Sequence, residues 1–258
     1  IPVGVAPNEV TFSPDGTVAY SANSGSNDIS VIDVASGTTV GLPIPVDAQP
    51  VSIAFVPNGS AAYVASNGGT VSVIDTASAL VTDTIAIAGA SFIEITPDGA
   101  TAYVASFGTN TVVPLDVATG VAGTPIPVGS GPTGLAISPD GSRLYVANTW
   151  DGTVSAIDIA TNTVITQIAV GPRPFQLTVS PDNSEVWVAV GDINALAVID
   201  AATLETVATI AVGQNPGSVT ISPDGTTALA ESYFDNAVTV VDVATRVVTS
   251  VISIGLNP

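Results

Sequence analysis

The residues of this chain that could do chemistry are almost all carboxylates. The sequence has 22 Asp and Glu residues against three Lys and Arg, and it has no His and no Cys. Imidazole bases, His-held metals, Ser–His or Cys–His pairs and thiolate metal sites are therefore excluded. What remains is oxygen ligation of a hard cation such as Ca²⁺, or acid–base work by two paired carboxylates.

The formal net charge of −19 bounds the partners. It argues against nucleic acid and against anionic membrane surfaces, and it suits cations or basic partners. Apolar content is high, at 46%, yet no run approaches about 18 apolar residues, so we expect no membrane insertion.

A Ser-Pro-Asp-Gly type of turn recurs six times along the chain and marks a repeated structural unit. Its prolines are Pro14, Pro57, Pro97, Pro139, Pro181 and Pro223, with spacings of 43, 40, 42, 42 and 42 residues. A period in the low forties with four short strands per unit predicts an all-β, six-bladed β-propeller, in which neighbouring blades cover both faces of most strands. A β-solenoid is the alternative, but its coils usually repeat at a shorter period.

The fourth unit illustrates the predicted blade. Its strands are expected at residues 134–138, 144–148, 154–158 and 164–170, separated by turn sequences. Units are expected to begin near residues 8, 51, 91, 133, 175 and 217, within a single domain of residues 1–258. For the outer strand of the closing blade, the C-terminal segment 247–254 is favoured over the N-terminal residues because it is longer.

Half of the acidic residues occupy repeated positions and are predicted to be scaffold. Six end the third strand of their unit: Asp33, Asp75, Asp116, Asp158, Asp200 and Asp242. Five follow the turn proline, where Asn58 takes the sixth place: Asp15, Asp98, Asp140, Asp182 and Asp224. Asp at such turns accepts backbone N–H bonds.

The other eleven acids gather at one end of the predicted fold. Since antiparallel strands alternate in direction, the loops from fourth to first strand and from second to third strand emerge at the same end. Eight of the eleven map there: Glu9, Asp28, Asp47, Glu94, Asp151, Asp192, Glu231 and Asp235. Loops gather both function and ordinary solvated charge, so both interpretations stay open.

Three of these acids suggest a cation site. Glu94 lies in an innermost strand where the other units have Thr or Ala, and Glu231 replaces an Ala found in the five other units. A carboxylate in such a crowded place is costly unless it is paired, hydrated or metal-bound. We expect Glu9, Glu94 and Glu231 to form an acidic axial mouth for a hard cation such as Ca²⁺; the alternative is that they face a water-filled channel. No other cofactor is expected.

Aromatic residues also break the repeat at the loop end, where they are candidates for ligand contact. The alternative is that they cap the blade cores. They are Phe92, Phe107, Trp150, Phe175, Tyr233 and Phe234. Arg173 lies among acids at this end and is expected to pair with one of them.

The Tyr-Val-Ala-Asn at residues 145–148, its counterparts at 20–23, 63–66 and 103–106, and the flanking Ser-Pro-Asp-Gly resemble the YVTN repeat of bacterial and archaeal β-propellers. The resemblance covers the whole chain. That family includes surface-layer-like proteins, binding domains and some enzymes, and many members have seven blades. It implies an exported or cell-surface bacterial protein; because the chain begins with Ile1, we expect any signal to lie outside this segment.

These observations favour a non-catalytic binding propeller, expected to be monomeric, whose loop end meets a protein, peptide or glycan. The expected ligand-binding residues are Glu9, Phe92, Glu94, Trp150, Asp151, Arg173, Phe175, Glu231, Tyr233 and Phe234. A structural spacer domain and a carboxylate-based hydrolase or lyase are the alternatives. Lactonases and lyases on propeller scaffolds resemble this chain, but their His-based chemistry is excluded here.

Overall fold

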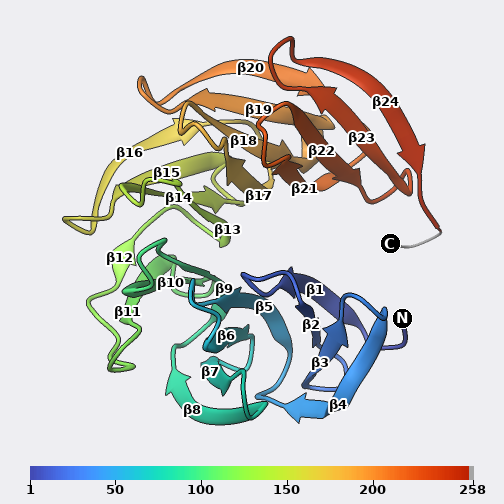
Figure 1. Ribbon diagram of the computed structural model, residues 1–258. Helices are drawn as coiled ribbons and strands as arrows, with labels where there is room; N and C mark the ends of the chain where they lie inside the picture. The colour runs from blue at the N-terminus through green and yellow to red at the C-terminus, as the bar shows by residue number, and fades with distance from the viewer. Residues whose placement is uncertain (256–258) are drawn as a thin grey trace. The chain divides into compact units, whose positions relative to one another are not determined.

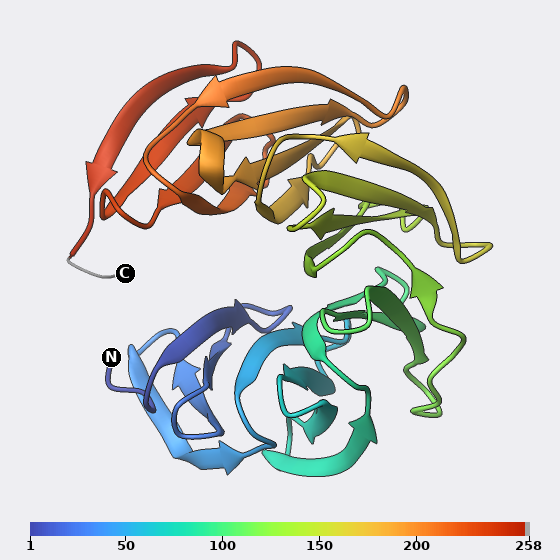
Figure 2. The same ribbon diagram turned by 180° about the vertical axis from the view of Figure 1, so that it is seen from behind.

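The strands of this protein are built from Val, Ile, Thr and Ala, whose side chains suit a pleated surface that is covered on both sides. The computed structural model describes residues 1–255 and shows a six-bladed β-propeller with four antiparallel strands in each blade (Figures 1 and 2). The chain divides into two compact units, Ile1–Pro125 and the part from Ile126 onward, which are described separately below.

The first unit contains the first two blades and three strands of the third. The strands are Pro7–Phe12 (β1), Val18–Asn23 (β2), Asp28–Asp33 (β3), Thr38–Pro45 (β4), Pro50–Phe55 (β5), Ala61–Ser66 (β6), Thr70–Asp75 (β7), Leu80–Ala86 (β8), Ala90–Ile95 (β9), Thr101–Ser106 (β10) and Thr111–Asp116 (β11). Within each blade, strands that follow one another in sequence are paired.

The second unit opens with the two-residue strand Ile126–Pro127 (β12) and continues with three blades. The strands are Pro132–Ile137 (β13), Arg143–Asn148 (β14), Thr153–Asp158 (β15), Thr163–Ala169 (β16), Pro174–Val179 (β17), Glu185–Val190 (β18), Ala195–Asp200 (β19), Glu205–Ala211 (β20), Pro216–Ile221 (β21), Thr227–Ser232 (β22), Ala237–Asp242 (β23) and Val247–Ser253 (β24). A single 3-10 turn, Gly191–Ile193 (η1), is the only helix in residues 1–255, and none there could cross a membrane.

The predicted repeat is confirmed. Each blade begins one residue before the predicted position, and in each case β1, β5, β9, β13, β17 or β21 is its first strand. β24 pairs with β23 as the outer strand of the sixth blade, as predicted, while residues 1–3 form no strand. The propeller fold also excludes the solenoid alternative, whereas the single domain stays a prediction.

β12 is much shorter than the other outer strands. The segment before it contains Gly120, Gly123 and Pro125, and Pro114 of β11 has no N–H to offer a neighbouring strand. Gly123 donates its N–H to the carbonyl of Pro114, and Ala122 forms an isolated antiparallel bridge with Leu115, so pairing with β11 begins here but is interrupted before β12. The third blade therefore lacks most of the outer strand expected from the repeat.

The repeated acids are scaffold, as predicted. All six aspartates that end third strands accept the backbone N–H of the residue three positions later at 2.7–2.8 Å. The five turn aspartates and Asn58 accept the N–H two positions later at 2.9–3.1 Å. The next residue supplies the positive φ of the turn; it is glycine in five turns, such as Gly141 with φ +70°, and Asn183 with φ +63° in the other.

The cores lie between neighbouring blades inside each unit. Tyr20, Tyr103, Tyr145 and Trp187 are fully buried and occupy the same repeat position, in the second strand of their blades. Around them, alanines and β-branched residues of adjacent sheets interlock into clusters that join two blades each. The first strands are thereby fixed side by side in each unit, with their loops at one end.

Candidate binding sites in the two units

Glu9 joins two blades of the first unit. Its Oε2 accepts the backbone N–H of Ile53 on β5 at 2.9 Å, and Thr11 Oγ1 donates to the Ile53 carbonyl at 3.2 Å. In the same way, Ser52 Oγ accepts the N–H of Ile93 on β9 at 3.3 Å. β1, β5 and β9 are neighbours (Figure 1), so side chains of one first strand satisfy the backbone of the next.

Glu94 is the carboxylate that the fold leaves without such a partner. It lies in β9 opposite Tyr103 of β10, is half-buried, and has no hydrogen bond within the described residues. Burial is the main cause, and repulsion from Glu9 the second, that raises the pKa of Glu94 to about 8. Burial also raises the pKa of Glu9, against the opposing effect of the hydrogen bond from Ile53.

A cavity of about 560 Å³ opens at the loop end of the first unit. Its apolar walls are Val51, Phe92 and Phe107, and the polar residues Asn8, Asn67 and Ser91 also line it, with Gly89 and Gly108. Asn8, Val51 and Ser91 occupy the same repeat position in three successive blades, so the cavity is formed where β1, β5 and β9 begin. Phe92, predicted from the sequence as a contact residue, is one of its walls.

The second unit has a hollow of about 550 Å³ at its loop end. Trp150, Asp151, Arg173 and Asp192 line it together with Gly152 and other loop residues. Arg173 Nη1 pairs with Asp192 Oδ1 at 3.0 Å, which confirms the prediction that Arg173 pairs with an acidic residue at this end. The Arg173 guanidinium also lies 5.1 Å from the centre of the Phe175 ring, which is the geometry of a cation–π contact.

Trp150 and Phe234 occupy the same repeat position, at the tip of the loop between the second and third strands. They are 63% and 65% exposed, whereas Gly25, Gly68 and Gly108 take this place in the first unit. The next residue fixes each loop: Asp151 Oδ2 accepts the N–H of Ser130, and Asp235 Oδ2 that of Gln214, both at 2.6 Å. Tyr233 packs edge-on against Phe234, with ring centres 5.4 Å apart.

Glu231 belongs to the second unit and accepts a hydrogen bond from Ser218 Oγ at 3.0 Å. No group of three or more acidic side chains that could hold a metal ion occurs in residues 1–255. The cation role predicted for Glu9, Glu94 and Glu231 therefore gains no support. The predicted contact residues form two groups. In the first unit they are Phe92, Glu9 and Glu94, and in the second unit they are Trp150, Asp151, Arg173, Phe175, Tyr233 and Phe234.

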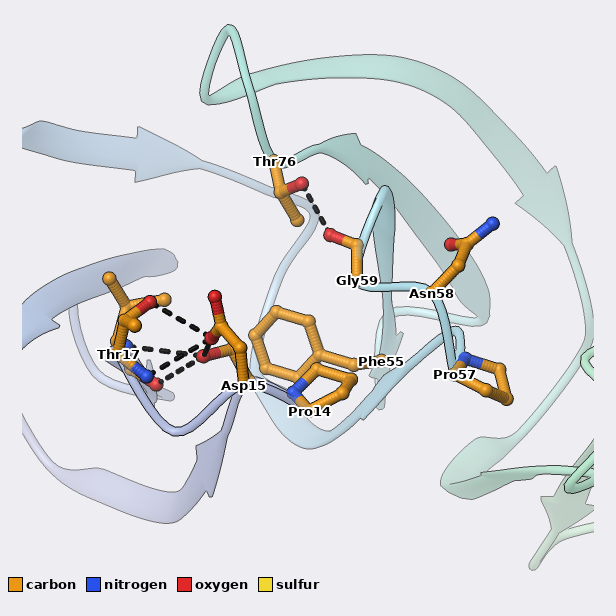
Figure 3. Close-up of a pocket in the computed structure, with 10 residues that line it drawn as sticks. Pro14, Asp15, Thr17, Phe55, Pro57, Asn58, Gly59 and Thr76 are labelled. Atoms are coloured by element: carbon orange, nitrogen blue, oxygen red, sulfur yellow. Dashed lines mark hydrogen bonds between the residues drawn. The ribbon is translucent and has the colours of Figure 1, made fainter.

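Sequence reasoning missed two cavities at the opposite end, between turns of adjacent blades. One, of about 480 Å³, lies between the turns at Pro14 and Pro57 and includes Phe55, Asp15 and Thr76 (Figure 3). Its counterpart between the fourth and fifth blades measures about 220 Å³, because Arg143 lies there and donates to the Ala201 carbonyl. Val18 holds the position of Arg143 in the first blade, a difference that the repeat alignment could have revealed.

Comparison with known proteins agrees with the fold. A family model described as "Lactonase, 7-bladed beta-propeller" matches residues 52–165, less than half of the chain. Hydrazine synthase of Kuenenia stuttgartiensis is similar in structure, with a TM-score of 0.91 and 22% identity over 100% of this chain and 90% of that chain. A functionally unknown protein from Desulfotomaculum acetoxidans DSM 771 gives 0.86 and 16%, with the same coverage.

At these identities the structural likeness shows the fold alone. The comparison with curated proteins finds no match. The lactonase-type match identifies part of the chain as similar to that propeller family, while the YVTN assignment made from the repeat stays a prediction.

Proposed function

We propose that this protein is a non-catalytic interaction module that binds a basic segment of a protein partner at the loop end of its second unit. The observation that carries the proposal is Trp150, which is 63% exposed beside the hollow that Asp151 and Arg173 also line. Trp, Tyr and Arg are the residues that most often dominate binding energy at protein interfaces.

The loops that carry these aromatics are held in place before any partner arrives. The bonds from Ser130 to Asp151 and from Gln214 to Asp235 fix the backbone, and Thr149 Oγ1 donates to the Pro174 carbonyl at 2.8 Å. Binding through preorganised groups loses less conformational entropy, which supports a contact role for the exposed rings.

Charge supports a basic partner. The second unit has twelve acidic residues against three arginines. Asp151 and Asp235 each directly follow an exposed aromatic residue, and Asp192 lines the same hollow as Trp150. The single cation at the hollow, Arg173, is already paired with Asp192. A segment that carries Lys or Arg would be steered to this surface and would lose affinity as salt is raised.

Intrinsic fluorescence offers a direct test, because the chain has two tryptophans and Trp187 is fully buried. A panel of Arg-containing peptides, with acidic peptides and neutral oligosaccharides for comparison, is titrated while acrylamide quenching is measured. We expect basic peptides to protect Trp150, and Trp150→Ala to weaken their binding at least tenfold. Leu42→Ala, at an exposed position of the first unit, is the control. Equal binding by Trp150→Ala, or protection only by oligosaccharides, would refute the proposed partner class.

A second candidate function is carboxylate-based hydrolysis, which the match to a lactonase family over residues 52–165 favours. Glu94 lies inside that range, and its raised pKa would let it hold a proton near neutral pH, as a general acid requires. A panel of lactones assayed between pH 6 and 9 tests this function. Turnover by the natural protein that disappears in Glu94→Gln would establish the enzyme. No turnover of any lactone by the natural protein would leave the binding role as the proposal.

The proposed location is the bacterial cell surface or the extracellular space, as the resemblance to YVTN-type propellers implies. Fractionation of cells that express the tagged natural protein tests this, since recovery from the cytoplasm alone would contradict it.

A further inference from the structure

The cavity of the first unit has the size and lining of a small-molecule site. Its volume is about 560 Å³, which lies in the range of pockets that hold drug-sized ligands. Two phenyl rings and Val51 offer apolar contact, while Asn8, Asn67 and Ser91 supply a few polar groups. This combination favours a ligand with an apolar body and a defined polar end.

The charged group nearest to this cavity along β9 is Glu94. Phe92 and Glu94 are paired regularly with Ala105 and Tyr103 of β10, so their side chains lie on the same face of the strand, about 7 Å apart along it. Glu94 therefore lies next to Phe92 on this face of β9, on the side away from the loop end. Glu9 interacts with it electrostatically from β1, beyond β5.

The first unit has no cation of its own to neutralise Glu94. Ten of the 22 acidic residues lie in residues 1–125, and all three arginines lie in the second unit. Glu9 is committed to the N–H of Ile53, whereas Glu94 has no hydrogen-bond partner within the described residues. A half-buried carboxylate of this kind is stabilised by an incoming positive charge.

We propose that the cavity of the first unit binds an organic ammonium ion with an apolar body, its apolar part between Phe92 and Phe107 and its ammonium group directed toward Glu94. Aromatic faces attract such cations, so the walls and the carboxylate favour the same ligand class. A carboxylate ligand of the same shape would be repelled, and a neutral alcohol would leave Glu94 without a counter-ion. This site is separate from the loops of the second unit and does not depend on the function proposed for them.

The probe is 2-phenylethylammonium, titrated at pH 8.5 by calorimetry, with 2-phenylethanol and 3-phenylpropionate as matched neutral and anionic compounds. We expect saturable one-to-one binding of the amine, at least tenfold weaker binding of the alcohol, and none of the anion. Glu94→Gln is expected to weaken amine binding at least tenfold. Asp83→Asn, which removes an exposed charge from β8 of the same unit, should leave binding unchanged.

Two further variants keep the test decisive if Glu94→Gln folds poorly. Phe107 is partly exposed, so Phe107→Ala should fold and bind the amine about fivefold more weakly. Gly108 has no heavy atom within 4 Å of an added Cβ, and Gly108→Phe should narrow the cavity and also weaken binding. The proposal is overturned if the amine shows no saturable binding, if the alcohol binds as well, or if Asp83→Asn lowers affinity as much as Glu94→Gln.

Discussion

The carboxylate of Glu9 accepts the backbone N–H of Ile53 at 2.9 Å, and this bond crosses from the first strand of one blade to the first strand of the next. Without it, the N–H of a fully buried isoleucine on β5 would have no acceptor from β1. Glu9 is therefore a structural link between blades as well as the charge that acts on Glu94.

Removing this link should destabilise the first unit. Glu9→Ala leaves the Ile53 N–H unsatisfied, which is expected to lower the free energy of unfolding by about 1–3 kcal/mol. Glu9→Gln keeps an acceptor oxygen at the same place and removes the repulsion of Glu94, so its loss should be smaller. Denaturant unfolding measures both; an equal loss in the two variants would contradict the assigned role of the hydrogen bond.

Glu94 should make the protein less stable as pH rises. Because burial and Glu9 raise its pKa in the folded state from 4.5 to about 8, the folded protein holds a proton that the unfolded chain releases. Stability from this group is therefore complete below pH 4.5 and declines as pH rises through 8. Glu94→Gln should match the natural protein near pH 4.5 and exceed it by about 5 kcal/mol above pH 8. Thermal melts across this range measure the difference, and parallel curves for the two proteins would exclude the shift.

The same titration should appear in ligand binding. At pH 6.5 Glu94 is largely protonated, so binding of an ammonium ion requires release of that proton, whereas above pH 8 it does not. Besides Glu94, the titratable residues on the neighbouring strands are Glu9 of β1 and Tyr103, which pairs with Glu94 from β10. β5, between β1 and β9, contributes Ser52 and Ala54. We expect affinity for 2-phenylethylammonium to rise at least fivefold from pH 6.5 to 8.5 in the natural protein and to stay level in Glu94→Gln.

The turn aspartates should make stability depend on pH in the opposite way to Glu94, so that stability is lost as pH falls. Hydrogen bonds from Ser180, Ser184 and the Ser184 backbone lower the pKa of Asp182 to about 2. A lowered folded-state pKa means stability that is present above pH 3.8 and is lost as pH falls toward 2. Asn accepts the same backbone bond at position 58, so Asp182→Asn should fold and lose less stability between pH 4 and 2 than the natural protein. Acid-unfolding curves by circular dichroism test this.

The two ion pairs of the second unit should differ in their contribution to the free energy of unfolding. Arg246 pairs with Glu185 at 2.5 Å, with side chains 35% and 18% exposed, and Trp187 donates to the other Glu185 oxygen. The Arg173–Asp192 pair is 44% exposed on both sides. We expect Arg246→Ala to cost about 1–2 kcal/mol and Arg173→Ala about 0–1 kcal/mol in unfolding free energy. A larger loss for Arg173→Ala would contradict this order.

Gly131 offers a test of how Trp150 is placed. It has φ +67°, and an added Cβ would lie 2.2 Å from Trp150 Cδ1. Gly131→Ala should therefore displace the indole, change its acrylamide quenching and weaken binding of the basic peptides. Gly37→Ala serves as the control, since its φ is +64° but no atom lies within 4 Å of the added Cβ. Unchanged quenching in Gly131→Ala would show that the indole does not depend on this close approach.

The blades and their order could be predicted from the amino-acid sequence alone. Turn residues such as Pro139 and Gly141 and third-strand acids such as Asp158 act through local hydrogen bonds and local φ values, so a repeat of about 42 residues is enough to place them. Departures from the repeat also identified Glu94 and Trp150 as unusual, because the other blades have Thr or Ala in place of Glu94 and the first three blades have Gly in place of Trp150.

Which of these residues act together depends on the three-dimensional packing of the chain. The Glu9–Ile53 bond, the interaction of Glu9 with Glu94 and the cavity that Asn8, Val51 and Phe92 share depend on how successive blades pack. Arg173 could be expected to pair, but its choice of Asp192 and its position over Phe175 depend on the path of two loops. Contacts between blades join residues about 40 positions apart, and no local pattern in the sequence encodes their distance or their burial.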